Sequence, residues 1–317
     1  MIKHAKFKRM FVLLLSVALL LAGCSSAQQK TNQGVIRIGY QKGDEFNIAK
    51  INGSLAKALK QKGYTVQWTE FQDGTSLLEA LNAGSIDYGR TGNTPPVVEQ
   101  ASGANIVYVG AGASKYEGSG ILVKKNSSIK SLSDLKGKKI AFSKGSSSQY
   151  LLVKGLEKVG LSMKDVTPVY MQPADASVAF GKGNVDAWVV WDPFTASAQT
   201  NENAKLLVDG QGLTTDRDFF IAKRSFAKSH QAVTALILNE VEQSMVWANK
   251  HHDALISKLA STLKMDRASI TLAVNRRVYG VGKITNQILD EQQSIADQFY
   301  QLKLIPKKID VHQAILK

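Results

Sequence analysis

The chain contains two pairs of similar segments that occur in the same order and at nearly the same spacing. Ile38–Gly43 (IGYQKG) matches Ile140–Gly145 (IAFSKG) at an offset of 102 residues, and Ala80–Asp87 matches Ala179–Asp186 at an offset of 99. Either match alone would carry little weight, but the shared order indicates two repeats of one structural plan. We therefore expect two similar folded units of about half the chain each.

Each repeat has the pattern of a strand, a turn, a helix and a further strand. β-branched and apolar residues precede each Lys-Gly turn, and apolar residues follow at helical spacing over 47–61 and 150–159. Strands that alternate with helices predict an α/β fold with mixed, mostly parallel sheets. Ligands bind beyond the carboxyl ends of such strands, so four repeated loops are expected to converge on one cleft between two hinged lobes.

The order of the predicted strands sets the limits of the two lobes. A strand over 121–123 leads from the first lobe into the second, and a strand over 219–222 leads back. We expect one lobe to comprise residues 35–120 and 219–317, and the other to comprise 121–218. The mainly helical segment after the second crossing is expected to pack on the first lobe.

The first 34 residues differ from the rest of the chain. A basic stretch ends at Arg9, a 12-residue apolar run covers Met10–Leu21, and Ala22-Gly23-Cys24 follows. A transmembrane helix needs about 20 apolar residues, so residues 1–23 are predicted to be a secretory signal peptide. The Leu-Ala-Gly-Cys motif resembles the lipobox of bacterial lipoproteins. It implies lipidation of Cys24, a tether over 24–34 and an extracytoplasmic protein anchored to the cell membrane.

Cysteine content and charge exclude several classes of function. Cys24 is the only cysteine, so an intrachain disulfide, a zinc ribbon and an iron–sulfur cluster are excluded. The formal net charge is +14, but the lysines are scattered singly or in pairs. Nucleic-acid binding needs clustered basic and aromatic residues or a known motif. We therefore expect a solvated basic surface and no nucleic-acid partner.

A serine-rich turn in the second repeat has the composition of an anion site. Gly145 is followed by Ser146, Ser147 and Ser148 where a helix is predicted to begin. A helix N-terminus presents unpaired N–H groups and a partial positive charge, and the hydroxyls add further donors. This pattern favours capture of a sulfonate or phosphate. The alternative is that one serine only caps the helix.

The other three loops supply the remaining candidates. The predicted ligand-binding residues outside the serine turn are Gln41, Thr91, Gly92, Asn93, Trp191 and Asp192. Trp191 can wall an apolar group or serve interlobe packing, and Asp192 can meet a ligand cation or cap a helix. Asp44 and Glu45 would repel a bound anion, so we expect them outside the pocket.

Catalytic patterns are absent from the sequence. It holds neither a Gly-x-Ser-x-Gly elbow nor a His-Glu-x-x-His helix. The histidines after the predicted signal all lie in the helical tail, at His230, His251, His252 and His312. We therefore expect no enzyme activity, no metal site and no cofactor.

Taken together, these motifs resemble those of the aliphatic sulfonate-binding proteins of ABC importers, within the wider sulfonate, nitrate and taurine receptor group. The segments that carry the resemblance are Arg37–Gly43, Leu78–Asp87, Thr91–Asn93 with Pro95-Pro96, Lys144–Ser148, Pro173–Ala176, Gly183–Trp188, Trp191–Pro193 and Leu304–Asp310. The resemblance implies a two-lobe periplasmic-binding-protein-like fold of type II. It also implies hinge closure on an alkanesulfonate and delivery to an ABC permease and its ATPase by a monomeric receptor.

Other functions stay open at this point. A receptor of the same kind could bind taurine, nitrate or a thiamine-pyrimidine precursor. An enzyme or a surface adhesion module could use the same two-lobe fold.

Overall fold

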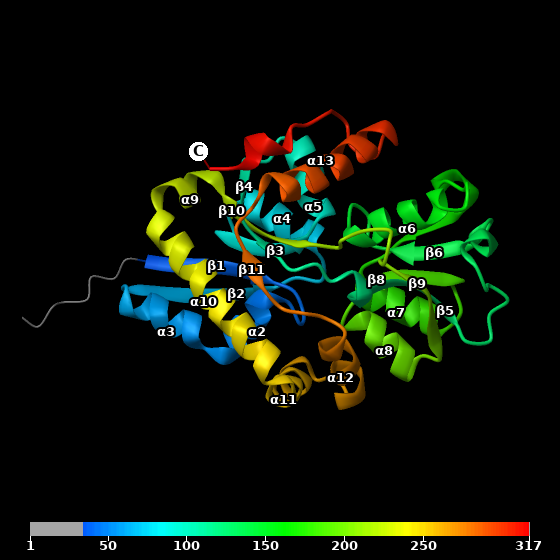
Figure 1. Cartoon of the computed structure of the whole chain (residues 1–317), viewed down its shortest axis with the longest axis horizontal. Coiled ribbons are helices and arrows are strands. Elements are labelled where there is room, and N and C mark those ends of the chain that lie inside the picture. Colours follow the sequence, from blue (N-terminus) through cyan, green and yellow to red (C-terminus); the bar gives the residue numbers. More distant parts are fainter. Residues whose placement is uncertain (1–33, 317) are drawn as a thin grey trace, which may run out of the picture. The chain divides into compact units, whose positions relative to one another are not determined.

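Two mixed β-sheets organise residues 34–316, the part of the chain that the computed structural model describes (Figure 1). The predicted signal peptide 1–23, Cys24 and most of the predicted tether lie outside the described residues, as does Lys317. Within residues 34–316, no helix has both the length and the apolar character needed to cross a bilayer.

The first sheet, sheet A, has six strands among the described residues, in the order β11-β4-β10-β3-β1-β2. They are β1 (Gly34–Tyr40), β2 (Tyr64–Glu70), β3 (Tyr88–Gly92), β4 (Ile106–Gly112), β10 (Asp218–Lys223) and β11 (Val281–Gly282). Strand β1 pairs in parallel with β2 and β3. Strand β10 lies antiparallel between β3 and β4.

The second sheet, sheet B, has five described strands in the order β7-β6-β8-β5-β9. They are β5 (Ser119–Lys124), β6 (Lys139–Phe142), β7 (Thr167–Tyr170), β8 (Ala187–Trp191) and β9 (Ala204–Asp209). Strand β6 pairs in parallel with β7 and β8, whereas β5 is antiparallel to β8 and β9. The sheets are therefore mixed, as predicted, and each contains an antiparallel strand that follows a crossing between them.

The duplicated motifs occupy equivalent places in the two sheets and make equivalent hydrogen bonds. Asp87 accepts a bond from the backbone N–H of Arg37 at 2.8 Å and returns its own N–H to the Arg37 carbonyl at 2.8 Å. Asp186 makes the same two bonds with Lys139, each at 2.8 Å. This matched pairing confirms that the chain is built on a duplicated plan.

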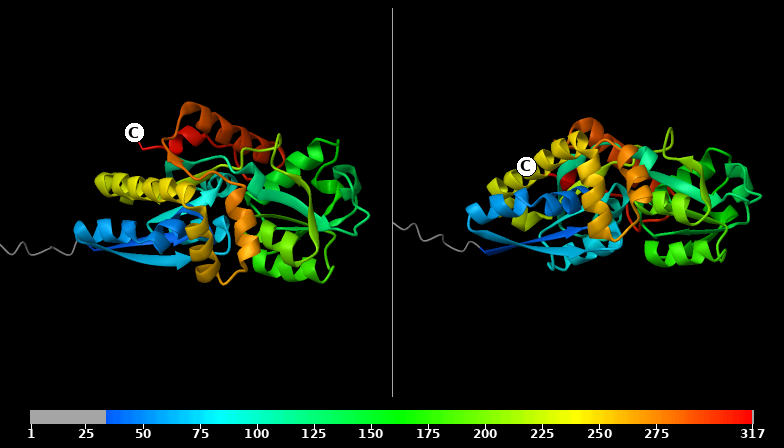
Figure 2. Two further views of the ribbon diagram at one scale, coloured as in Figure 1. Left: turned by 60° about the horizontal axis from the view of Figure 1, so that its bottom comes forward. Right: turned by 90° about the horizontal axis from the view of Figure 1, so that it is seen from below.

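Helices cover both faces of each sheet (Figure 1, Figure 2). Those packed around sheet A are α2 (Glu45–Asn52), α3 (Ser54–Gln61), α4 (Gly74–Asn82), α5 (Thr94–Ala101), α9 (Arg224–Ser229), α10 (Gln231–Lys250), α11 (His252–Leu263) and α13 (Asn286–Gln301). Those packed on sheet B are α6 (Ser147–Glu157), α7 (Pro173–Gly181) and α8 (Phe194–Asn201). Short 3₁₀ turns cover Tyr116–Gly118, Leu132–Leu135, Met163–Asp165 and Val311–Ala314.

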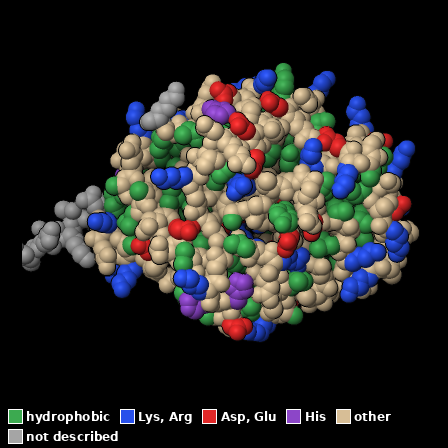
Figure 3. Space-filling model, in the orientation of Figure 1, with side chains coloured by type: hydrophobic (Ala, Val, Ile, Leu, Met, Phe, Trp, Pro, Cys, Tyr) green, Lys and Arg blue, Asp and Glu red, His purple; other side chains and the backbone are tan. Residues whose placement is uncertain are grey.

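Apolar side chains fill the space between sheets and helices. Ile38 and Phe220 are fully buried between sheet A and its helices, and Ile140 and Phe142 are fully buried within the core of sheet B. Basic side chains are spread over the face of the molecule in Figure 3, with acidic ones among them.

Two crossing segments join the sheets, and they are bonded to each other. The N–H of Lys115 donates to the Thr215 carbonyl at 3.2 Å, and the N–H of Gly210 donates to the Tyr116 carbonyl at 2.9 Å. A Cβ on Gly210 would lie 2.9 Å from that carbonyl oxygen, so the close approach requires glycine. The paired crossings form the narrow link expected of a hinge.

Helix α12 (Arg267–Asn275) departs from the expectation that the whole tail packs on the first lobe. It packs against α8, beside sheet B (Figure 1). The reason is polar: Asn201 donates to Asp266 at 2.7 Å, and the hydroxyls of Thr200 and Ser269 bond at 2.5 Å. The tail therefore connects the two sheets at a point away from the crossing segments.

Candidate functional site

A small cavity lies where strand ends from both sheets meet. The residues that line it are Gln41, Gly74, Arg90, Thr91, Gly92, Pro95, Lys115, Ser146, Ser147, Trp191 and Asp218. Six of the ten predicted ligand-binding residues are among them: Gln41, Thr91, Gly92, Ser146, Ser147 and Trp191. Its volume is about 20 Å³, little more than a single water molecule requires.

The cavity is tight because the two sheets touch beside it. A Cβ on Gly92, at the end of β3, would lie only 2.1 Å from the Ser147 Oγ at the start of α6. Thr75 Oγ1, on α4, also donates to the Lys144 carbonyl at 3.3 Å. The described structure is therefore a closed arrangement, and Gly92 is the residue that permits it.

The turn before α6 leaves hydrogen-bond donors unused. Ser146 is the N-cap residue but forms no side-chain cap bond, since its hydroxyl donates to the Ser143 carbonyl at 2.6 Å. Among the described residues, the N–H groups of Ser147 and Ser148 find no acceptor, and the buried Ser148 hydroxyl has no partner. Gly145, at φ 71°, allows the turn, but it and Ser148 do not line the cavity.

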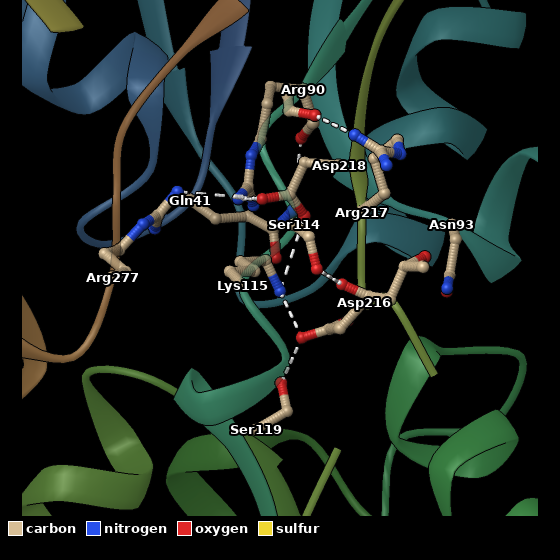
Figure 4. Close-up of polar contacts among 12 residues, drawn as sticks. Gln41, Arg90, Asn93, Ser114, Lys115, Ser119, Asp216, Arg217, Asp218 and Arg277 are labelled. Atoms are coloured by element: carbon tan, nitrogen blue, oxygen red, sulfur yellow. Dashed lines mark hydrogen bonds and ion pairs between the residues drawn. The ribbon is translucent and has the colours of Figure 1, made fainter. Parts of the chain in front are cut away.

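The loop after β3 presents a second unused donor. The Thr91 hydroxyl lines the cavity, is fully buried and has no partner among residues 34–316. Asn93, in contrast, does not line the cavity. Its side chain accepts a bond from the Thr94 hydroxyl at 3.0 Å and lies 3.5 Å from the Thr214 hydroxyl (Figure 4). The loop thus contributes Thr91 and Gly92 to the cavity, while Asn93 contacts the second crossing segment.

The other two strand-end turns are capped by their own carboxylates. Asp44 accepts bonds from the N–H groups of Gln41 and Asn47, each at 2.7 Å, at the start of α2. Asp192 accepts from the N–H of Ala196 at 3.0 Å, at the start of α8, and does not line the main cavity. Burial raises the pKa of Asp44 to about 7 and that of Asp192 to about 6. Helix capping, rather than exposure to the cavity, is what the structure shows for both carboxylates.

A buried charge cluster adjoins the cavity (Figure 4). Glu45 lies 2.6 Å from both Arg90 and Arg277, and Arg90 also pairs with Asp218. Lys115 lies 2.6 Å from Asp216 and 3.5 Å from Asp218. Three cations thus face three carboxylates, so the cluster is close to neutral as a whole.

Mutual pairing keeps this cluster charged. Burial alone would raise the pKa of Glu45, but Arg90 and Arg277 outweigh it and lower that pKa to about 2. Burial lowers the pKa of Lys115, and Asp216 partly offsets this effect. The Ser119 hydroxyl bonds to Asp216, so the cluster includes both crossing segments and the first strand of sheet B.

The expectation that the cleft is lined only by uncharged donors is wrong. Arg90, Lys115 and Asp218 line the cavity and were not among the predicted residues. Asp44 and Glu45 do stay out of this cavity, but because they are buried in caps and ion pairs rather than exposed. A charged residue inside a predicted strand, as at Arg90, is the one signal that could have revealed the cluster.

Comparison with known proteins gives the family. A family model described as NMT1/THI5 like matches residues 59–254. The alkanesulfonate-binding protein SsuA from Xanthomonas axonopodis pv. citri, solved bound to MOPS, is 36% identical. That alignment covers 89% of this chain and 98% of SsuA, with a TM-score of 0.86. The chain belongs to the aliphatic sulfonate-binding protein family.

Two further relatives support this family assignment. The periplasmic aliphatic sulphonate binding protein SsuA from Escherichia coli is 38% identical, with a TM-score of 0.80 and coverage of 89% of this chain and 92% of that one. The taurine-binding periplasmic protein of Escherichia coli is 27% identical over 285 residues, which is 83% of this chain and 86% of that protein. These relatives are binding proteins, and the sulfonate-binding family shares the two-sheet α/β fold described above.

Proposed function

We propose that this member of the sulfonate-binding family is an extracytoplasmic solute-binding protein that delivers an aliphatic sulfonate to an ABC importer. One observation carries the proposal: two turns from opposite sheets meet at a single cavity, and both hold buried donors without acceptors. Thr91 supplies a hydroxyl on one side, and the turn of Ser146 to Ser148 supplies N–H and O–H groups on the other.

A sulfonate matches these donors chemically. It is a permanent anion with three acceptor oxygens, and fixed neutral dipoles can replace its water shell without an unpaired buried cation. The N-terminus of α6 adds a favourable dipole. The neighbouring charge cluster is internally paired, so it neither attracts nor strongly repels the ligand. Trp191 is the apolar wall for the alkyl group, and Gln41 borders the same cavity.

Binding requires hinge motion, because the closed cavity is too small for a sulfonate. Residues 35–120 with 219–317 form one lobe and residues 121–218 the other, and the paired crossing segments act as the hinge. Ligand binds the open form, and closure brings Gly92 against Ser147. The closed form is the state that docks on the permease and its ATPase.

The location follows from the start of the sequence. Residues 1–23 are removed as a signal peptide, and Cys24 carries the lipid that holds the protein on the outer face of the cell membrane. The tether over 24–34 lets the monomeric receptor reach the permease.

A thermal-shift screen of the purified protein tests the proposal. Probes are ethanesulfonate, octanesulfonate, taurine, nitrate, sulfate and a pyrimidine. A ligand at 100 times its Kd stabilises the folded protein by about 2.7 kcal/mol, which a melting curve resolves. We expect alkanesulfonates to raise the Tm and to be recovered unchanged. A response to nitrate or pyrimidines alone would overturn the substrate class, and ligand turnover would indicate an enzyme.

A serine substitution links the response to the site. Ser147→Ala removes a hydroxyl that lines the cavity, so we expect about tenfold weaker alkanesulfonate binding. Ser133→Ala, on an exposed 3₁₀ turn, is the matched control and should bind like the parent protein. Equal affinities for both variants would contradict the placement of the site.

A further inference from the structure

A second, larger hollow lies next to the cavity, between α4, α5 and the turn before α6. Its volume is about 530 Å³. It adjoins the cavity: Thr75 and Gly145 line the hollow, while their chain neighbours Gly74 and Ser146 line the cavity. We call it the outer groove.

The outer groove contains a buried carboxylate without a counter-ion. Glu99, on α5, is only 8% exposed, and its side chain makes no hydrogen bond or ion pair with any of the described residues. Burial, and then the nearby Glu79 on α4, raise the pKa of Glu99. An unpaired carboxylate in such a place is destabilising unless a cation or donor meets it.

The other charged groups of the groove do not relieve Glu99. Asp73 is occupied as the N-cap of α4, where it accepts from the N–H of Ser76 at 3.0 Å. Lys144 is exposed, and its Nζ lies 5.6 Å from the centre of the Tyr170 ring rather than in an ion pair. With Asp73, Glu79 and Glu99 against Lys144, the groove has a net formal charge of −2, in a chain whose total is +14.

The remaining walls are partly apolar. Met171, Phe299 and Leu304 line the same groove as Glu99. A carboxylate beside aliphatic and aromatic surface suits a cation that carries carbon rather than a hydrated metal ion.

We propose that the outer groove binds an organic ammonium group, with Glu99 as its counter-ion and Glu79 as a second acidic neighbour. The ammonium can belong to the transported molecule, whose sulfonate would lie in the adjoining cavity, or to a separate alkylamine. The site itself does not depend on the proposed sulfonate function.

Calorimetric titration with three probes distinguishes the two sources. The probes are butanesulfonate, 4-aminobutanesulfonate and n-butylammonium, the last added with and without saturating butanesulfonate. If the ammonium belongs to the ligand, 4-aminobutanesulfonate binds about tenfold tighter than butanesulfonate, as a charge-assisted bond allows. If it belongs to a separate molecule, n-butylammonium binds by itself.

Carboxylate-to-amide variants assign the effect to the groove. Glu99→Gln keeps the side-chain size, so the extra affinity for either ammonium probe should be lost while butanesulfonate affinity is unchanged. Glu79→Gln, at an exposed position, should lose part of it, and Glu240→Gln on α10 is the matched control. Ammonium affinity that is absent, or that survives both Glu99→Gln and Glu79→Gln, would overturn the proposal. Loss of butanesulfonate binding by the parent protein would overturn only the sulfonate function.

Discussion

The turns before α2 and α6 follow equivalent strands of the two sheets, yet they begin their helices differently. Each contains a Lys-Gly pair whose glycine is left-handed, at φ 73° for Gly43 and 71° for Gly145. The next residue is Asp44 in one turn and Ser146 in the other. Asp44 caps its helix, whereas Ser146 forms no side-chain cap bond and leaves α6 open.

The second pair of turns shows the same contrast with the sheets exchanged. Asp192 caps α8 on sheet B, whereas Asn93 makes no cap bond to α5 on sheet A. Each sheet therefore has one capped turn and one open turn, and the two open turns face each other. A duplicated fold can build a single asymmetric ligand site by leaving different turns uncapped in its two halves.

The largest expected effect is on the stability of the capped side. Arg277→Met removes one of the two cations that hold the buried Glu45, so the free energy of unfolding should fall by about 3 kcal/mol. Urea denaturation measures it. The control is Arg267→Met, since Arg267 is half exposed and lies 3.6 Å from Asp253. Equal, small losses in both variants would show that the α2 turn is not held by this pair.

The next effect converts the open turn into a capped one. Ser146→Asp gives α6 the residue that caps α2, so the Tm should not fall, while a carboxylate now faces the bound anion. We expect at least about 100-fold weaker alkanesulfonate binding, which corresponds to about 2.7 kcal/mol. Calorimetry measures the affinity. Undiminished binding would show that the open cap is not the anion site.

A smaller effect is expected where the open turns touch. Gly92→Ala places a methyl group 2.1 Å from the Ser147 Oγ, so closure must displace that hydroxyl, and affinity should fall about tenfold. In a Ser147→Ala background the same change should cost less, because the clashing oxygen is gone. Gly282→Ala, where a Cβ meets nothing within 4 Å, is the control. Additive losses in the double variant would contradict the contact.

The smallest effect is a pH dependence on the capped side. The pKa of Asp44 is raised to about 7, so the folded protein keeps a proton that the unfolded chain releases above about pH 4. Stability should therefore fall as the pH rises between about pH 5 and pH 7. Asp44→Asn removes this titration, and its Tm should decline less than that of the parent protein over that range. Identical slopes in melting curves would contradict the shifted pKa.

Local patterns were enough to predict the turns but not the charges around them. The Lys-Gly turns, the serine-rich helix start and the duplicated Asp were visible because each depends on neighbouring residues. The ion pair between Glu45 and Arg277 joins residues 232 positions apart, and no local pattern links them. The contact of α12 with α8 likewise depends on long-range polar bonds at its first turn.

Side-chain direction was the other limit. Thr91 and Asn93 belong to one short loop, and both were reasonable ligand candidates. Only the backbone geometry decides that Thr91 lines the cavity while Asn93 contacts Thr94 and Thr214. The sequence thus predicted which loops meet, whereas the structure determined which of their side chains face the cavity.

A crystal structure with bound ethanesulfonate would show most directly whether the two open turns share one ligand. The sulfonate oxygens should lie within about 3 Å of the N–H groups of Ser147 and Ser148 and of the Thr91 hydroxyl, with Gly92 alongside. A sulfonate bound at the start of α2 or α8, or only in the outer groove, would contradict this account of the site.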